Sequence, residues 1–277
     1  GNVTLTTDAG NGVINMGTLQ QSAGDLILVT NGSGSATVVN NAAIDFGTSN
    51  VGGNLSATAS AGTITQAGGT LTVAGTSAFT TSTNDQAITL GNTSNAFTGT
   101  VAFTTGGTAG NVTIDNGTTA LDLAASTISG TLSATGGASA GIVDSGNVAV
   151  AGNVTLTTDA GNGVINMGTL QQSAGDLILV TNGNGAATVV NNVGIDFGTG
   201  NVGGNLAATA STGNITQVGG ALTVAGTSNF TTSADDADIT LTQANALTGA
   251  VTFTSTDTNS ANEEDIALTN SIGVVLA

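Results

Sequence analysis

The first 32 residues of the chain, GNVTLTTDAGNGVINMGTLQQSAGDLILVTNG, occur a second time without any change from Gly152 to Gly183. The two copies stay in step at a constant offset of 151 until a one-residue deletion near Asn245. Such self-similarity is the signature of repeat architectures. We therefore expect a first repeat unit over residues 1–151 and a second, partial copy over 152–277, joined in one continuous stack.

Each copy is built from strand-like runs that alternate with short Gly- and Asn-rich connectors. In NVTLTT, Val3 and Leu5 fall on one face, which is the period of two expected for a half-buried strand. Related phrases begin at Gly53, Ser77, Thr100, Gly130 and Gly152, in steps of 24, 23, 30 and 22. A unit of roughly 20–30 residues cannot bury its own apolar face, but stacked units share a continuous core.

This pattern predicts an all-β parallel β-helix, or β-solenoid, with coils of roughly 20–30 residues. A string of β-sandwich domains is the alternative, but such domains usually have aromatic cores and guarded edges. This chain has seven Phe, no Trp, no Tyr and no Pro. The side chains expected inside the solenoid are Val3, Leu5, Ile27 or Leu28, Ile64, Val73, Phe79, Val101 and Phe103.

Some polar residues are repeated as strictly as the apolar residues. Asn40 and Asn41 recur as Asn191 and Asn192, at positions that read as corners. Stacked amide side chains can hydrogen-bond from one layer of a β-stack to the next. We therefore expect these Asn residues to fix the register of the coils, although recent duplication explains the copying equally well.

The composition excludes several classes of function. The chain has no Lys, Arg, His or Cys and carries a formal net charge of -17. General acid–base and nucleophilic catalysis therefore lack their usual groups, and no cation is present to hold a phosphate. Nucleic acid and anionic membranes are repelled, and no apolar run is long enough to span a bilayer. We expect no enzyme, no nucleic-acid binding and no membrane insertion.

The phrases GNLSATASAGTITQAGGTLTVAGTSAFTTS, AITLGNTSNAFTGTVAFTT and NVTIDNGTTALDLAASTISGTLSATG resemble the imperfect repeats of large exported bacterial adhesins of the filamentous-hemagglutinin type. The resemblance covers nearly the whole chain, but the amino-terminal secretion domain of that family is not recognisable in it. It implies a right-handed parallel β-helix outside the cell that acts as a rigid stalk, adhesin or matrix fibre.

Two acidic stretches are weak candidates for binding Ca²⁺, which takes six to eight oxygen ligands. They contribute Asp235, Asp236, Asp238, Glu263, Glu264 and Asp265. Neither stretch matches a known calcium loop, and solvated turns explain both more simply. Five further carboxylates are scattered along the chain: Asp8, Asp45, Asp115, Asp122 and Asp144. A pair of carboxylates can catalyse glycoside hydrolysis, but these residues are more simply explained as turn caps.

We therefore expect a non-enzymatic, extracellular β-solenoid section of a surface adhesin, stalk or fibre, without a cofactor. A subunit of a self-assembling filament is the alternative. In either case each end of the solenoid should stack on more β-coil, from the same chain or from a neighbouring identical subunit. Host or surface glycans are further candidate partners.

Overall fold

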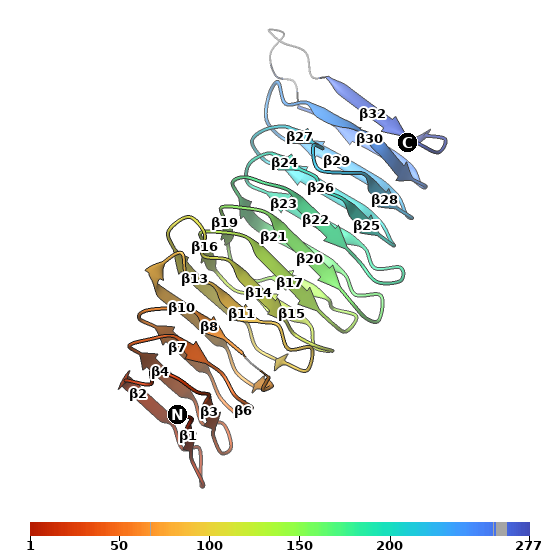
Figure 1. Cartoon of the computed structure of the whole chain (residues 1–277). Coiled ribbons are helices and arrows are strands. Elements are labelled where there is room, and N and C mark those ends of the chain that lie inside the picture. Colours follow the sequence, from red (N-terminus) through yellow and green to blue (C-terminus); the bar gives the residue numbers. More distant parts are fainter. Residues whose placement is uncertain (67, 257, 259–264) are drawn as a thin grey trace.

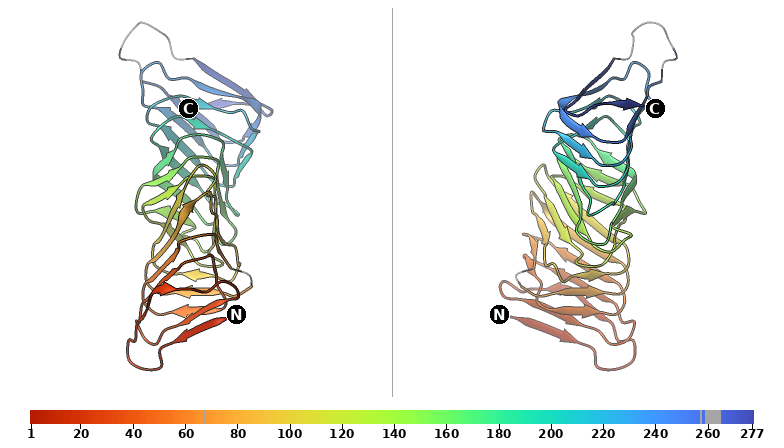
Figure 2. Two further views of the ribbon diagram at one scale, coloured as in Figure 1. Left: turned by 60° about the vertical axis from the view of Figure 1, so that its left-hand side comes forward. Right: turned by 90° about the vertical axis from the view of Figure 1, so that its right-hand side faces the viewer.

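The chain forms a rod of parallel strands that wind through about 12 coils. The computed structural model describes residues 1–66, 68–256, 258 and 265–277, and the two termini lie at opposite ends of the rod (Figures 1 and 2). At ~4.8 Å per coil the rod is about 58 Å long. No segment of the described chain forms an apolar helix of membrane-spanning length. The predicted all-β solenoid is confirmed.

Three sheets form the walls of the rod, and every strand pair in them is parallel. The long sheet has 15 strands: β2 (Ile14–Leu19), β4 (Ala36–Asn40), β7 (Leu55–Ala59), β10 (Ser77–Asn84), β13 (Val101–Gly106), β15 (Leu121–Leu123), β16 (Ser126–Ile128), β18 (Ile142–Asp144), β19 (Val148–Val150), β21 (Ile165–Gln172), β23 (Ala187–Asn191), β26 (Leu206–Ala210), β29 (Ser228–Thr232), β31 (Ala250–Thr254) and β33 (Val275–Leu276).

The second sheet has 13 strands: β5 (Ile44–Asp45), β8 (Ile64–Thr65), β11 (Ile88–Leu90), β14 (Val112–Asp115), β17 (Leu132–Gly136), β20 (Val154–Thr158), β22 (Leu177–Val180), β24 (Ile195–Asp196), β25 (Gly200–Val202), β27 (Ile215–Thr216), β28 (Leu222–Val224), β30 (Ile239–Leu247) and β32 (Ile266–Asn270). The short sheet has five: β1 (Val3–Thr6), β3 (Leu26–Val29), β6 (Ser49–Val51), β9 (Leu71–Val73) and β12 (Ala96–Phe97).

The cross-section of the rod changes along its length. From β3 to β14 the chain passes in turn through the short, the long and the second sheet. The short sheet ends at β12, and the next two coils place two strands each in separate columns of the long sheet, β15 and β18 in one and β16 and β19 in the other. The single long strand β21 then pairs with both columns. With β24, a new column of strands opens inside the second sheet, next to β27. We call the part from β14 to β22, which lies between these two changes, the waist.

One coil takes 19 residues at its shortest, where Ala36 pairs with Leu55, and 27 at its longest, where Ile239 pairs with Ile266. The predicted coil length is therefore confirmed, but the step of 30 between the phrases at Thr100 and Gly130 was not a coil. The phrase at Thr100 enters the long sheet as β13, whereas the phrase at Gly130 enters the second sheet as β17. Similar sequences therefore form strands in different sheets.

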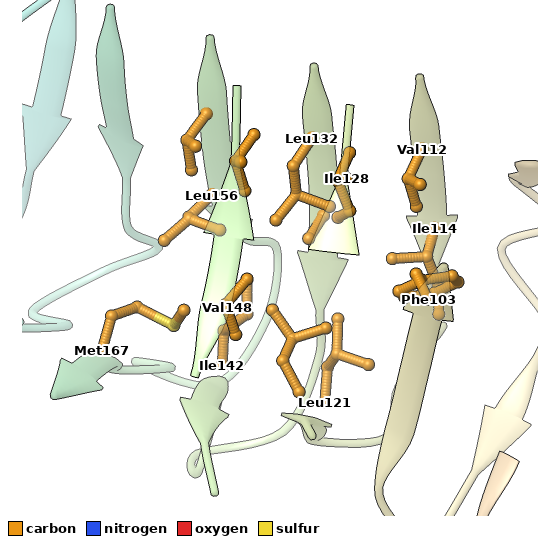
Figure 3. Packing of buried hydrophobic residues seen from close by; sticks show 14 of the residues in the cluster. Phe103, Val112, Ile114, Leu121, Ile128, Leu132, Ile142, Val148, Leu156 and Met167 are labelled. Carbon is orange, nitrogen blue, oxygen red and sulfur yellow. The ribbon is translucent and has the colours of Figure 1, made fainter. Parts of the chain in front are cut away.

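The core is a continuous set of apolar rows between the walls. At the waist, Leu121, Leu132 and Ile142 are among the buried side chains that fill the interior between the strands (Figure 3). Phe79 stacks on Phe103 of the next coil, with ring centres 6.0 Å apart. The side chains predicted to be inside are buried, with Leu28 rather than Ile27 at its position. Val3 and Leu5 are only half-buried, because no coil lies beneath β1.

Buried Asn side chains take the place of a peptide group at the corners. The fully buried Asn191 amide accepts a hydrogen bond from the Gln172 N–H (2.8 Å) and donates to the Gln172 carbonyl (3.0 Å) and the Gly194 carbonyl (2.7 Å). The same three-bond arrangement recurs at Asn40, Asn116 and Asn270. Each amide bonds the backbone of the preceding coil, not another amide, and the neighbours Asn41 and Asn192 are exposed.

Related segments alternate between opposite walls. LSATA forms β7 in the long sheet, LSATG forms β17 in the second sheet, and LAATA forms β26 back in the long sheet. The buried Asn residues follow the same alternation, because Asn40 and Asn191 end strands of the long sheet and Asn116 follows a strand of the second. The 151-residue unit therefore contains two related halves, whose equivalent strands lie in opposite sheets.

The Asn191 amide provides a test of this corner. We expect Asn191→Asp to lower the free energy of unfolding by ~3 kcal/mol, because a carboxylate cannot donate to the two carbonyls and its charge would be buried. The matched control is Asn192→Asp on the exposed neighbour, expected to change stability by less than ~0.5 kcal/mol. Chemical unfolding and hydrogen exchange at Gln172 measure both. Equal stability of the two variants would contradict the assignment.

Asp85 makes one turn sensitive to acid. The backbone N–H groups of Thr108 (2.6 Å) and Ala109 (2.8 Å) donate to its Oδ1, and these bonds lower the pKa of the carboxyl. The native carboxyl thus releases its proton more readily than the unfolded one. Its small contribution to stability is present above pH ~4 and is lost as the pH falls through the native pKa.

We therefore expect the Thr108 and Ala109 amide proton signals to shift as Asp85 is protonated below pH ~4. In Asp85→Asn these shifts should be absent, whereas the control Asp8→Asn, at another exposed turn, should keep them. Amide NMR over this pH range is the measurement. Identical titration of the two amides in wild type and Asp85→Asn would refute the assignment.

Candidate functional site

The waist carries the main concave surface that we find on the rod. Two depressions of about 470 and 420 Å³ share Ser173 and Val193, and a third of about 180 Å³ shares Gln171 and Asn192 with the second. We call this continuous surface the waist groove. It is defined by Thr127, Ser129, Gln171, Ser173, Asn192 and Val193.

The groove exists because successive coils differ in width. After β21, the chain reaches β22 through residues 173–176 alone, with no strand of a third wall between them. The next coil inserts β24 between β23 and β25, so its wall projects beyond the coil below. The step between the narrow and the wide coil forms the floor and one side of the groove. Residues 127–129 and 149–151 of the lower coils extend it along the rod.

The first strand of a sheet column borders the groove. β24 is the end strand of its column, and the N–H groups of Ile195 and Phe197 both donate to the following coil, at 2.9 Å each. Toward the preceding coil, Phe197 is bridged to Leu177 of β22, and Asp196 lines the groove beside this bridge. The Asp196 carboxylate accepts a hydrogen bond from the Val218 N–H (2.9 Å). It is the one acidic residue among those that line the three depressions.

The remaining groove lining is uncharged and combines apolar side chains, such as Ile128 and Val193, with polar ones. Asn192 and Ser173 are exposed and Gln171 is half-buried. The side-chain amides of Gln171 and Asn192 have no hydrogen-bond partner within the described part of the chain. A smaller depression of about 210 Å³ recurs at the matching place in the first copy, lined by Leu19, Gln20 and Asn41 among others. The groove lining can therefore offer unused donors and acceptors to a ligand.

No motif in the sequence indicates this groove directly. Gln171 and Ser173 belong to QQSAG, which reads as an ordinary connector, and Thr127 lies far from them in the chain. The available signal was the length of one connector. Residues 173–176 alone join β21 to β22, whereas in the next coil the strand β24 lies between β23 and β25. That signal can be read only once the walls are known.

The calcium site stays a prediction. Glu263 and Glu264 lie outside the described residues, and within the described part no three carboxylates are grouped to hold a metal. Asp235 accepts hydrogen bonds from the N–H and the hydroxyl of Thr258. Asp238 accepts from the Asp265 N–H (3.0 Å). Asp236 lies in the same turn with a φ of 57°.

Three of the five scattered carboxylates bind neighbouring turns and coils, as the turn-cap reading predicts. Asp144 accepts hydrogen bonds from the N–H groups of Gly168 and Thr169, both at 2.8 Å. Asp45 accepts from the Thr65 hydroxyl (3.0 Å), and Asp115 accepts from the N–H of Gly117 (2.8 Å). Asp122 lies half-buried on β15, and Asp8 lies in an exposed turn. These bonds give the carboxylates of Asp45, Asp115 and Asp144 a structural role between strands and turns.

Comparison with known proteins identifies a repeat family. Its model, described as repeats of unknown function (DUF5649), matches residues 33–104, 109–184 and 183–254. The matches begin about 75 residues apart, which agrees with the two related halves of each 151-residue unit. No curated protein and no solved structure matches the chain. Because the matches span well over half of the sequence, the chain belongs to this family of repeats of unknown function.

Proposed function

We propose that this chain is a structural, non-enzymatic section of a long extracellular adhesin, stalk or fibre. A repeat β-solenoid is typical of structural proteins. The extracellular setting is supported by the resemblance of the repeats to those of exported adhesins. The mechanical role is supported by the coil-to-coil backbone bonding, which continues without interruption across residues 151 and 152 through the pairing of β20 with β17 and β22.

The observation that carries the proposal is a comparison of two identical segments. In the second copy, Val154, Leu156 and Met167 are fully buried. The matching residues of the first copy, Val3, Leu5 and Met16, are only half-buried. The sequences are the same, and the difference is the coil beneath, which β17, β18 and β19 supply in the second copy. The lower surface of the first coil therefore fits a coil of that kind.

The opposite end has a corresponding open surface. Phe253 is half-buried, whereas the matching Phe103 is covered by the following coil and fully buried. Val275 and Leu276 of β33 are 60% and 69% exposed. These apolar side chains favour continued stacking at this end too. They equally suit the second candidate, a filament subunit that pairs end to end with identical copies.

A fusion tests the stacking directly. We expect that placing residues 107–151 immediately ahead of Gly1 raises the thermal midpoint by several degrees and protects the amides of Thr4 and Thr6 from hydrogen exchange, because the N–H of Val3 already bonds the following coil. The junction is native, because Ala151 precedes Gly152 in the same way. Burial of the half-exposed apolar side chains supplies the stabilisation, at ~25 cal/mol per Å².

The matched control is the same fusion with Leu132→Asp and Val148→Asp, whose native side chains are buried and lie in strands that pair with β20 and β21. It should give no added protection at Thr4 or Thr6. A native fusion without added protection would overturn the proposal. Sedimentation of the original chain separates the two candidates, since concentration-dependent growth of end-to-end oligomers is expected for the filament subunit alone.

A further inference from the structure

We propose that the waist groove is a binding site for an extended, uncharged polysaccharide. The inference deepens the proposed function, because it gives the rod a ligand surface in addition to its mechanical role. It stands on three observations: the groove is long, its lining combines apolar and uncharged polar side chains, and its amide side chains are unused by the fold.

The shape of the groove fits a chain rather than a compact ligand. Its depressions join end to end through shared residues, from Thr127 on a lower coil to Asp196 on β24. The line therefore crosses several coils along the rod. A polymer laid across these coils can contact every part of the groove, whereas a small molecule would fill only one depression.

The chemistry of the lining fits sugar hydroxyls. The amides of Gln171 and Asn192 each offer donors and an acceptor, and Ser173 adds a hydroxyl. Val193 and Ile128 provide apolar contact for the C–H faces of sugar rings. Such a combination of apolar walls with a few polar groups is typical of ligand sites.

Charge selects against most other polymers. The chain has no Lys or Arg and a net charge of -17, so it repels anionic polysaccharides and nucleic acid. The same field attracts cationic peptides, but Asp196 is the one acidic residue that lines the groove, and the Asp144 carboxylate at its edge accepts hydrogen bonds from the N–H groups of Gly168 and Thr169. The groove itself therefore presents mainly dipoles, which favours a neutral ligand.

The test uses the purified chain and a panel of uncharged polysaccharides: dextran, laminarin, cello-oligosaccharides and galactomannan. Alginate serves as the anionic probe and polylysine as the cationic probe. We expect saturable binding to at least one neutral member by calorimetry, with NMR shifts at the Gln171 and Asn192 side-chain amides. We expect at least a tenfold loss of affinity in Gln171→Ala/Asn192→Ala.

The repeat offers a matched control in Gln20→Ala/Asn41→Ala, which changes the same residue types at the corresponding place in the first copy. There the lower coils that complete the groove are missing, so affinity should change less than twofold. Thermal unfolding of both double variants should match the wild type, because neither pair of side chains bonds within the described fold.

Three results would overturn the inference. They are the absence of saturable binding to any neutral member, an equal loss of affinity in the two double variants, and binding of polylysine alone that is abolished in Gln171→Ala/Asn192→Ala. None of these results bears on coil stacking, so failure here is distinct from failure of the proposed function. The fusion of residues 107–151 ahead of Gly1 adds a further readout, because completing the first-copy groove should raise the stoichiometry from one to two.

Discussion

The structure depends on one requirement: the backbone of each coil must find its hydrogen-bond partners on the neighbouring coils. A buried N–H or C=O without a partner is costly, and the described residues form no helix that could satisfy these groups locally. The parallel ladders meet the requirement along the walls. At corners where a ladder breaks, the Asn191 amide and its counterparts supply the missing donor and acceptor. This explains why buried polar residues are copied as strictly as the apolar rows.

The alternation of walls follows from the lengths of the coil and of the family repeat. One repeat of about 75 residues spans about three and a half coils, so each repeat begins on the wall opposite to the previous one. Two repeats restore the original wall, which makes the 151-residue unit the true translational period. For this arrangement to work, both walls must accept the same strands. The shared apolar alternation of β7 and β17 meets that condition.

Much of the fold could be predicted because the internal repeats and the period-two alternation of apolar residues are visible in the sequence. The buried positions of Phe79 and Phe103 follow directly from them. Which wall a strand joins could not be predicted, since LSATA and LSATG read alike and yet lie in different sheets. The waist groove was hidden for a related reason. It arises from a strand that one coil lacks, and its lining comes together only after several coils have stacked.

The groove lies where the regular pattern of the rod changes, and this has a physical cause. A uniform solenoid has flat or convex walls, because each coil covers the one below it. Concavity appears only where the width of the coils changes, as it does between β21 and β24. In a longer array that change would recur once in every 151-residue unit, on the same wall each time. Weak sites at regular spacing on a stiff rod bind a polymer far more tightly together than singly.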